Sequence, residues 1–141
     1  MKTYLLSLLK VVLVFFAPIA PLIFLVALST IFDTCFGMWR SNKQGIKISS
    51  KTFRHGFVPK LLSYVGAVIV VYLSDFFLLN DLIHLVVDID FLSTKMISLV
   101  LISIEVKSID ESFEAVNGYS FLKKATGIIL RAKNIKKGLN E

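Results

Sequence analysis

The sequence predicts an all-α integral membrane protein with about three transmembrane helices, the first long and proline-kinked, and a C-terminal basic amphipathic helix. Three observations support this fold class. The chain of 141 residues is 55% hydrophobic and 18% charged, with a mean hydropathy of +0.75, and soluble domains are ordinarily less apolar and more charged. Apolar segments occur at residues 11–32, 61–79 and 91–106. Basic residues gather between the first two segments and after the third.

The first apolar segment extends back to about residue 5, so it is longer than the roughly 20 residues that cross a bilayer. Pro18 and Pro21 interrupt it. Because proline lacks a backbone N–H and clashes with the preceding turn, we expect the helix to kink or break near these two residues.

Two interpretations of this segment remain open. In the first, one kinked helix crosses the membrane and residues 4–10 lie at the interface. In the second, a short helix over residues 4–16 turns at the prolines, and residues 20–39 form the main span. We favour the first, since the second places Lys10 at mid-depth in the bilayer, which costs several kcal/mol unless the side chain reaches the interface.

The second and third segments differ in how clearly they predict a span. Residues 61–79 contain a single charged side chain, Asp75, near their far end, and this is the clearest span in the chain. Residues 91–106 are shorter, with Lys95 near the start and Glu105 near the end. They predict either a marginal span or an interfacial helix.

Orientation follows from the positive-inside rule, because cytoplasmic loops collect Lys and Arg. We expect residues 33–60 to form a basic cytoplasmic loop and residues 107–141 a basic cytoplasmic tail, with the acidic linker 80–90 outside. Residues 1–106 then form the transmembrane domain, and the N-terminus lies outside. The basic side chains expected to set topology and to contact anionic lipid are Arg40, Lys43, Lys47, Lys51, Arg54, Lys60, Lys123, Lys124, Arg131 and Lys133.

The tail is predicted to contain a basic helix with an apolar stripe along one face. We expect this helix to lie on the anionic cytoplasmic leaflet or to pack on the chain's own spans. A free-standing coiled coil is disfavoured, because the seam is short and Gly127 and Gly138 weaken it. The stripe consists of Phe121, Ala125, Ile128, Ala132, Ile135 and Leu139.

The sequence offers no catalytic, cofactor-binding or metal-binding pattern. Cys35 is the single cysteine, and His55 and His84 each lack a second ligand at helical spacing. We therefore expect neither enzyme activity nor a cofactor. The formal net charge of +6 comes from basic residues that flank apolar segments, so membrane lipids are the expected partners and nucleic acid is not.

Polar and small residues near the spans are candidates for contacts between chains. Asp33 and Asp75 lie within a turn or two of the expected membrane edges, where hydration makes an acid tolerable. The alternative is a role in oligomer contacts or in an aqueous lumen. Ser63, Gly66 and Ala67 would permit close approach of neighbouring helices.

The order of these motifs resembles that of the holins that serve phage lysis and toxin secretion, over roughly residues 25–118. The matching features are an apolar helix ending in Asp33 and then Gly37, the basic stretch 41–60 with its serine pair, a second helix closing on Asp75, and an acidic segment with Glu105 and the "SIDE" of residues 108–111. The chain departs from the family's pattern at Ser112, which replaces an asparagine, and after Gly118, where proline is missing.

The resemblance implies a homo-oligomer in the inner, cytoplasmic membrane of a host bacterium. Such an oligomer opens a timed lesion or pore that releases an endolysin or a toxin and triggers lysis of the host cell. The alternative is a non-lytic membrane anchor or accessory subunit that docks a partner through its basic tail. Residues that would carry oligomer contacts or line the pore are Asp33, Gly37, Ser63, Gly66, Ala67, Asp75, Glu105, Ser108 and Glu111.

Overall fold

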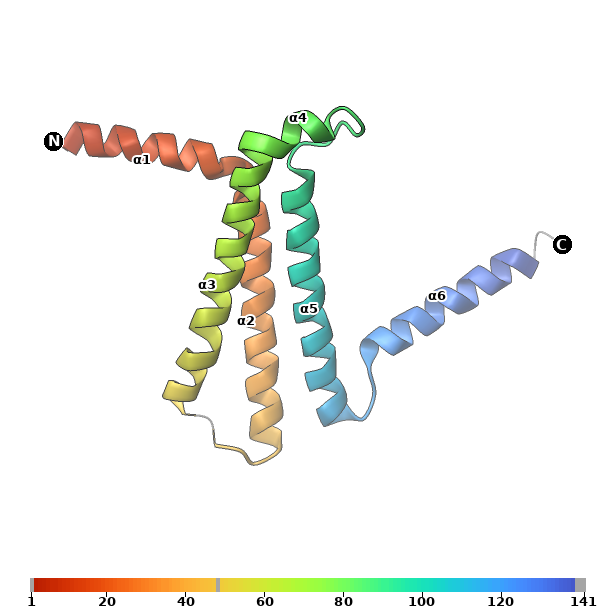
Figure 1. Cartoon of the computed structure of the whole chain (residues 1–141). Helices are drawn as coiled ribbons and strands as arrows, with labels where there is room; N and C mark the ends of the chain where they lie inside the picture. The colour runs from red at the N-terminus through yellow and green to blue at the C-terminus, as the bar shows by residue number, and fades with distance from the viewer. Residues whose placement is uncertain (1, 48, 139–141) are drawn as a thin grey trace.

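The computed structural model describes residues 2–47 and 49–138, with side chains described for residues 4–47, 49 and 53–131. All regular secondary structure in these residues is helical, as the sequence predicts. Helices α2 (Ala20–Lys43), α3 (Ser50–Ser74) and α5 (Leu92–Asn117) lie side by side and alternate in direction (Figure 1). Helices α1 (Lys2–Phe16) and α6 (Phe121–Gly138) extend away from this bundle at its two opposite ends (Figure 1).

The bundle helices are long enough for a bilayer. They contain 24, 25 and 26 residues, which at a rise of 1.5 Å makes each about 36–39 Å long, against a hydrocarbon thickness of about 30 Å. Two helical stretches, Tyr4–Lys43 and Phe53–Ile83, are long and apolar enough to cross a membrane. α5 carries more charge, so a third span stays a prediction; its charged residues are Lys95, Glu105, Lys107, Asp110, Glu111 and Glu114.

The chain changes direction at the two prolines. α1 (Lys2–Phe16) ends before Pro18, which lies in the single 3₁₀ turn η1 (Ala17–Ile19), and Pro21 is in the first turn of α2. At the first positions of a helix, a missing N–H leaves no hydrogen bond unmade. α1 then extends outward from the end of the bundle (Figure 1). The helix breaks at the prolines, as the sequence predicts, but Tyr4–Lys43 forms one long apolar helical stretch. Both interpretations of how this stretch crosses the membrane stay predictions.

Aromatic packing and a hydrogen bond hold this corner. The ring centroids of Phe15 and Tyr72 are 5.5 Å apart, and the buried Tyr72 hydroxyl donates a hydrogen bond of 2.7 Å to the carbonyl of Phe15. That carbonyl belongs to the last turn of α1, where backbone acceptors lack helical partners. These contacts therefore fix the end of α1 against α3.

The connection between the first two bundle helices is much shorter than predicted. The sequence suggests a loop over residues 33–60, but α2 continues to Lys43 and α3 begins at Ser50. The prediction of a long loop is wrong because Lys and Arg are good helix formers, so that a run of charge marks a membrane edge without ending the helix. Gly45, with φ of +72°, turns the chain after α2.

At the other end of the bundle, α3 passes into a π-helical turn, η2 (Asp75–Leu79), and then into the one-turn α4 (Asn80–Ile83). α5 begins where the third apolar segment predicts it, but it ends at Asn117, far beyond residue 106. The predicted boundary between spans and tail therefore falls inside a continuous helix.

α6 (Phe121–Gly138) agrees with the helix that the apolar stripe predicts. Gly118, with φ of +74°, ends α5 in a left-handed conformation, and its N–H donates to the Glu114 carbonyl at 2.8 Å. Several residues of the predicted stripe and of the predicted basic set have side chains outside the described part of the chain: Lys51, Ala132, Lys133, Ile135 and Leu139.

The burial pattern is inverted relative to a soluble helical bundle. Among the described side chains, the buried apolar residues are Ile19, Val26, Val68, Tyr72 and Leu101, and the buried polar ones are Thr30, Asp75, Thr94, Ser98, Glu105, Asp110, Ser112 and Ser120. Leu, Val, Ile and Phe side chains cover the outward faces. Soluble bundles bury their apolar stripe, whereas polar side chains face inward when lipid surrounds the protein.

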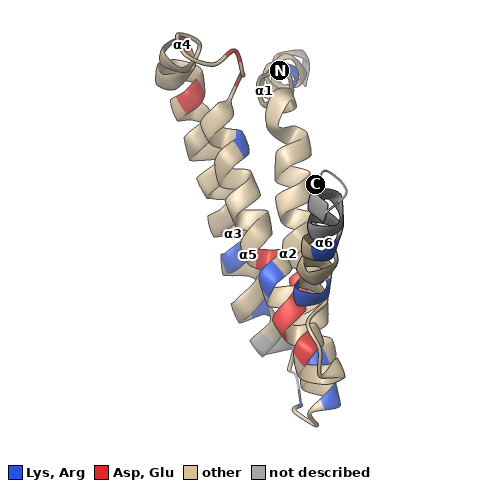
Figure 2. Ribbon diagram, turned by 90° about the vertical axis from the view of Figure 1, so that its right-hand side faces the viewer, with Lys and Arg blue, Asp and Glu red and all other residues tan. Residues whose placement is uncertain are grey.

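Charge is distributed unevenly along the bundle. Figure 2 shows Lys, Arg, Asp and Glu gathered in the half of α2, α3 and α5 that includes the connection between α2 and α3, and on α6. The other half of the bundle has few charged residues before the turn at α4 (Figure 2).

Candidate functional site

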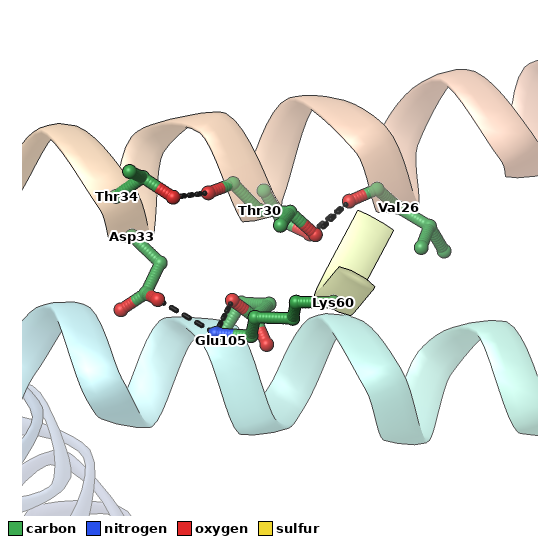
Figure 3. A network of polar contacts seen from close by, with 7 residues as sticks. Val26, Thr30, Asp33, Thr34, Lys60 and Glu105 are labelled. Carbon is green, nitrogen blue, oxygen red and sulfur yellow. Dashed lines mark hydrogen bonds and ion pairs between the residues drawn. The ribbon is translucent and has the colours of Figure 1, made fainter. Parts of the chain in front are cut away.

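Three charged side chains meet inside the bundle, one from each long helix. Asp33 comes from α2, Lys60 from α3 and Glu105 from α5, and they point toward one another (Figure 3). The Lys60 Nζ lies 2.7 Å from Asp33 Oδ2 and 2.7 Å from Glu105 Oε2. We call these residues the charged cluster. One ammonium group therefore links all three bundle helices.

The two threonines beside Asp33 donate their hydroxyl hydrogens to carbonyls of α2 and not to the Asp33 carboxylate. Thr30 donates its hydroxyl to the Val26 carbonyl at 2.9 Å, and Thr34 donates to the Thr30 carbonyl at 2.8 Å. Both hydroxyls beside Asp33 are thus satisfied within α2 (Figure 3). The Asp33 carboxylate instead accepts a hydrogen bond from Lys60.

The charged cluster is unbalanced. Two carboxylates share one ammonium, and the Glu105 side chain is completely buried. The Lys60 Nζ forms an ion pair with Glu105, and Tyr64 of α3 also interacts with this carboxylate, but neither contact has the geometry of a full hydrogen bond. A buried carboxylate with incomplete hydrogen bonding is costly. This makes Glu105 the least satisfied charge in the described bundle and the centre of the candidate site.

A cavity of about 410 Å³ opens beside the charged cluster, toward the connection between α2 and α3. Its wall combines basic, hydroxyl and apolar groups from all three bundle helices. The lining residues are Asp33, Thr34, Gly37, Met38, Arg40, Ser41, Ile46, Lys47, Phe53, Gly56, Phe57, Lys60, Ser108 and Ser112.

Asp75 lies apart from the charged cluster and has a different role. Its Oδ2 accepts hydrogen bonds of 2.7 Å from both the N–H and the hydroxyl of Thr94, in the first turn of α5. Asp75 thus caps α5 from another helix, since first-turn N–H groups have no helical acceptor. Its Oδ1 is buried without a hydrogen-bond partner in the described chain. This explains why an acid directly follows the apolar α3.

The small residues predicted to allow close helix approach do not do so within the chain. A Cβ atom added at Gly37 or Gly66 would meet no heavy atom within 4 Å. Ser63 is exposed on α3, and Ala67 is half-buried. Within one chain, Gly37 and Gly66 are not close-packing positions, and their role in contacts between chains stays a prediction.

The remaining predicted residues are divided between the cavity and the surface. Arg40 and Lys47 line the cavity, as does Ser108, whereas Lys43 and Arg54 are exposed outside it.

Other predicted residues of α5 and α6 lie at the surface. Glu111 is exposed and lies 3.9 Å from Lys107. Further along the chain, Lys123 pairs with Glu114 at 2.8 Å, Lys124 lies 3.7 Å above the Tyr119 ring, and Arg131 is exposed.

Sequence reasoning missed the corner between α5 and α6. The Asp110 carboxylate accepts hydrogen bonds from the Ser120 hydroxyl at 2.6 Å and from the N–H groups of Phe121 and Leu122 at 2.8 and 3.2 Å. Ser120 itself accepts from the Lys123 N–H at 3.0 Å. Gly118 followed by Ser120 is a helix stop and start signal in the sequence, but nothing in the spacing identifies Asp110 as the second cap.

The electrostatics of this corner follow from those hydrogen bonds. Desolvation raises the pKa of Asp110, but the hydrogen bonds from Ser120, Leu122 and Phe121 and the charge of Lys123 outweigh it, so the pKa of this carboxyl lies below its ordinary value of 3.8. The carboxylate is also favoured at the N-terminus of α6 by the helix dipole.

A histidine and two acids lie together near α4. His84 Nδ1 is 3.2 Å from Asp88 Oδ1, and its Nε2 is 3.0 Å from Asp90 Oδ1. No group of three or more His, Cys, Asp or Glu side chains within the described residues is arranged to hold a metal ion.

Comparisons of the chain with models of known families, with curated proteins and with solved structures found no match.

Proposed function

We propose that this chain associates laterally in a bacterial inner membrane and opens a lesion there, as a holin does, releasing an endolysin or a toxin. The observation that carries the proposal is the charged cluster inside a bundle whose outer surface is apolar. A bilayer-spanning protein retains buried charge at a cost, and intramembrane ionisable groups usually mark a water or ion path.

The inward polar side chains supply a surface that water could wet. Thr30 of α2 faces inward, and so do Thr94 and Ser98 of α5. In lipid, the hydrophobic effect does not hold helices together, and small polar residues do so through close packing and hydrogen bonds. When several chains associate, these three side chains can give up their contacts within the chain. They then contact neighbouring chains and water instead.

Opening of the bundle would relieve the imbalance in the charged cluster. In the closed bundle, Glu105 interacts with Lys60 and Tyr64, but neither contact has the geometry of a full hydrogen bond. If α5 moves away from α2 within an oligomer, the carboxylate gains water and the desolvation cost is recovered. The charged cluster would thus hold the three helices together in the single chain and line the lesion in the oligomer.

The distribution of basic residues gives the proposed orientation. Arg40, Lys43 and Lys47 lie at or beyond the end of α2 that adjoins α3, and the positive-inside rule places this end in the cytoplasm. The turn at α4 and the helix α1 are then on the outer side, and α6 begins on the cytoplasmic side. The basic face of α6 would lie on the anionic leaflet.

A non-lytic anchor or accessory subunit is the second candidate. It is favoured by one observation: α6 projects away from the bundle (Figure 1) and has Lys124 and Arg131 exposed on its surface. An anchor would use this helix to dock a partner, and its bundle would remain closed.

Timed expression in a bacterial host separates the two candidates. After induction, the chain is expected to accumulate without harm and then to abolish membrane potential abruptly, and culture turbidity should fall only when an endolysin is co-expressed. A truncation after Gly118 serves as the comparison, since it removes α6 but keeps the bundle. If the full chain accumulates in the membrane without loss of potential, the proposal is wrong and the anchor function takes its place.

A further inference from the structure

The cavity beside the charged cluster has an excess of cationic groups. Arg40 and Lys47 line it, and neither side chain makes an ion pair with a described acid. Asp33 also lines the cavity, but it is already paired with Lys60. The cavity therefore presents two cations whose counter-charge is not supplied by the described part of the chain.

The two cations differ in exposure. Arg40 is half-buried in the last turn of α2, and Lys47 is exposed in the short connection after Gly45. Arginine presents donors in a planar fork that matches phosphate oxygens, and lysine adds a compact charge. Hydroxyl groups of Ser41, Ser108 and Ser112 line the same cavity.

Apolar side chains line the same cavity. Phe53 and Phe57 stack with ring centroids 5.4 Å apart and line the cavity together with Met38 and Ile46. A volume of about 410 Å³ is within the range of ligand pockets, about 300–1,000 Å³. A ligand that fills this space meets cationic, hydroxyl and apolar groups, so an anion that also has an apolar part suits it better than a wholly polar anion.

We propose that the cavity binds the phosphate headgroup of an anionic phospholipid from the cytoplasmic leaflet. The phosphate would contact Arg40 and Lys47, glycerol oxygens would contact the serine hydroxyls, and the acyl chains would leave along Phe53 and Phe57. Free phosphate offers the same anion but gives no reason for the apolar wall. The proposal requires that α2 and α3 lie in a bilayer, and it is independent of whether the chain forms lesions.

The single tryptophan of the chain, Trp39, is a natural reporter for this site. It precedes Arg40 and lines a neighbouring hollow together with Lys47. The experiment uses the full chain in nanodiscs of phosphatidylcholine that contain a minor fraction of phosphatidylglycerol. In one arm the phosphatidylglycerol has brominated acyl chains. In the other arm the phosphatidylglycerol is not brominated, and an equal number of phosphatidylcholine molecules have brominated acyl chains. Bromine quenches tryptophan fluorescence only at close range, so the ratio of quenching in the two arms measures local enrichment of the anionic lipid.

The expected result is stronger quenching by brominated phosphatidylglycerol, which falls to the phosphatidylcholine level in Arg40→Gln and in Lys47→Gln. Arg54→Gln is the matched control, because Arg54 is exposed on α3 and does not line the cavity. Lys47 lies outside any helix, so its replacement tests the site without disturbing the bundle.

Three outcomes would overturn the proposal. Equal quenching in the two arms would show that the anionic lipid is not enriched. An equal loss in Arg54→Gln would show diffuse attraction to the basic end and not a site. Loss of the phosphatidylglycerol preference on adding inorganic phosphate, at constant ionic strength, would assign the cavity to a free anion and not to a lipid.

Discussion

The Lys60 ammonium lies 2.7 Å from the Glu105 carboxylate, and Glu105 is completely buried. These residues are on different helices, and Lys60 also bonds to Asp33 on a third. Removal of a shared cation is more damaging than removal of either acid, because it leaves two unpaired carboxylates inside the bundle. The relationship between Lys60 and Glu105 therefore predicts an order of effects among variants of the charged cluster.

Lys60→Met should destabilise the bundle by at most about 3–5 kcal/mol, the cost of breaking a fully buried ion pair, because the Lys60 side chain is itself 30% exposed. Glu105→Gln should cost less, since it removes one of two competing negative charges. Unfolding of the purified chain by SDS in mixed micelles measures the difference. Lys43→Met, at an exposed position at the end of α2, should have little effect.

The triple variant Asp33→Asn, Lys60→Met, Glu105→Gln provides the second half of this test. Removal of all three charges eliminates the desolvation cost together with the ion pairs, so stability should recover most of what Lys60→Met loses. A triple variant as unstable as Lys60→Met would show that shape and packing at these positions matter more than charge.

Asp75→Ala should loosen the start of α5. The variant loses the acceptor for the Thr94 N–H and hydroxyl, and loss of a helix cap costs about 1–2 kcal/mol. Hydrogen exchange should accelerate in the first turn of α5 more than in its middle. Asp81→Ala, at an exposed residue of α4, is the comparison, and equal acceleration in both variants would argue against a cap.

The corner between α5 and α6 should respond to acid. Because the pKa of Asp110 is lowered in the folded chain, its stabilising effect is fully present above the ordinary value of 3.8 and is lost as the pH falls through the lower folded value. Spin labels on α6 should gain mobility in that acidic range. Asp110→Asn should be mobile already at neutral pH, and Glu111→Gln should behave like the unchanged chain.

Gly37 of α2 and Gly66 of α3 test for contacts between chains. No atom of the same chain would meet a Cβ at Gly37 or Gly66, and Ala favours a helix over Gly by up to about 1 kcal/mol. Gly37→Ala and Gly66→Ala should therefore keep or raise the stability of the single chain. Gly37→Leu should reduce crosslinked oligomers only if another chain packs there, and unchanged crosslinking would remove Gly37 from the interface.

Topology can be measured separately from function. Reporters placed after residue 45 and at the C-terminus should be cytoplasmic, and a reporter near Asp81 should be external. A cytoplasmic signal at Asp81 would contradict the proposed three spans. Replacement of Arg40, Lys43 and Lys47 by Gln should disturb the orientation more than replacement of Lys123 and Lys124, because the first group lies between two spans.

The sequence predicted local features better than contacts between helices. Hydrophobic periodicity after Gly118 predicted α6 almost to its ends. The helical class and the breaking effect of Pro18 and Pro21 also followed from short-range chemistry. Both prolines lie in the first turn of a new helix, and the choice between one kinked span and a short helix followed by a span stays a prediction.

Lys60 shows why the site itself was harder to predict. In the sequence it is one of several basic residues before an apolar segment, and this pattern indicates topology. Its partners are Asp33, 27 positions earlier, and Glu105, on the next bundle helix. Pairings at such separations depend on how the three helices pack, and a single sequence does not reveal this packing. The roles of Asp75 and Asp110 as caps for other helices were missed for the same reason.

The central claim is that α2 and α5 must move apart before the membrane opens, and a reversible tether between them tests it most directly. Trp39 of α2 and Phe113 of α5 lie with ring centroids 6.2 Å apart. In a Cys35→Ser background, Trp39→Cys and Phe113→Cys provide two thiols for a reducible crosslinker, and each single-cysteine chain treated with the same reagent is the control.

Membrane potential is then followed in cells that express the tethered chain. The account predicts that the tethered chain accumulates in the membrane without depolarisation, and that depolarisation follows when the crosslinker is reduced. Depolarisation by the tethered chain at the same time and to the same extent as by the single-cysteine controls would contradict it.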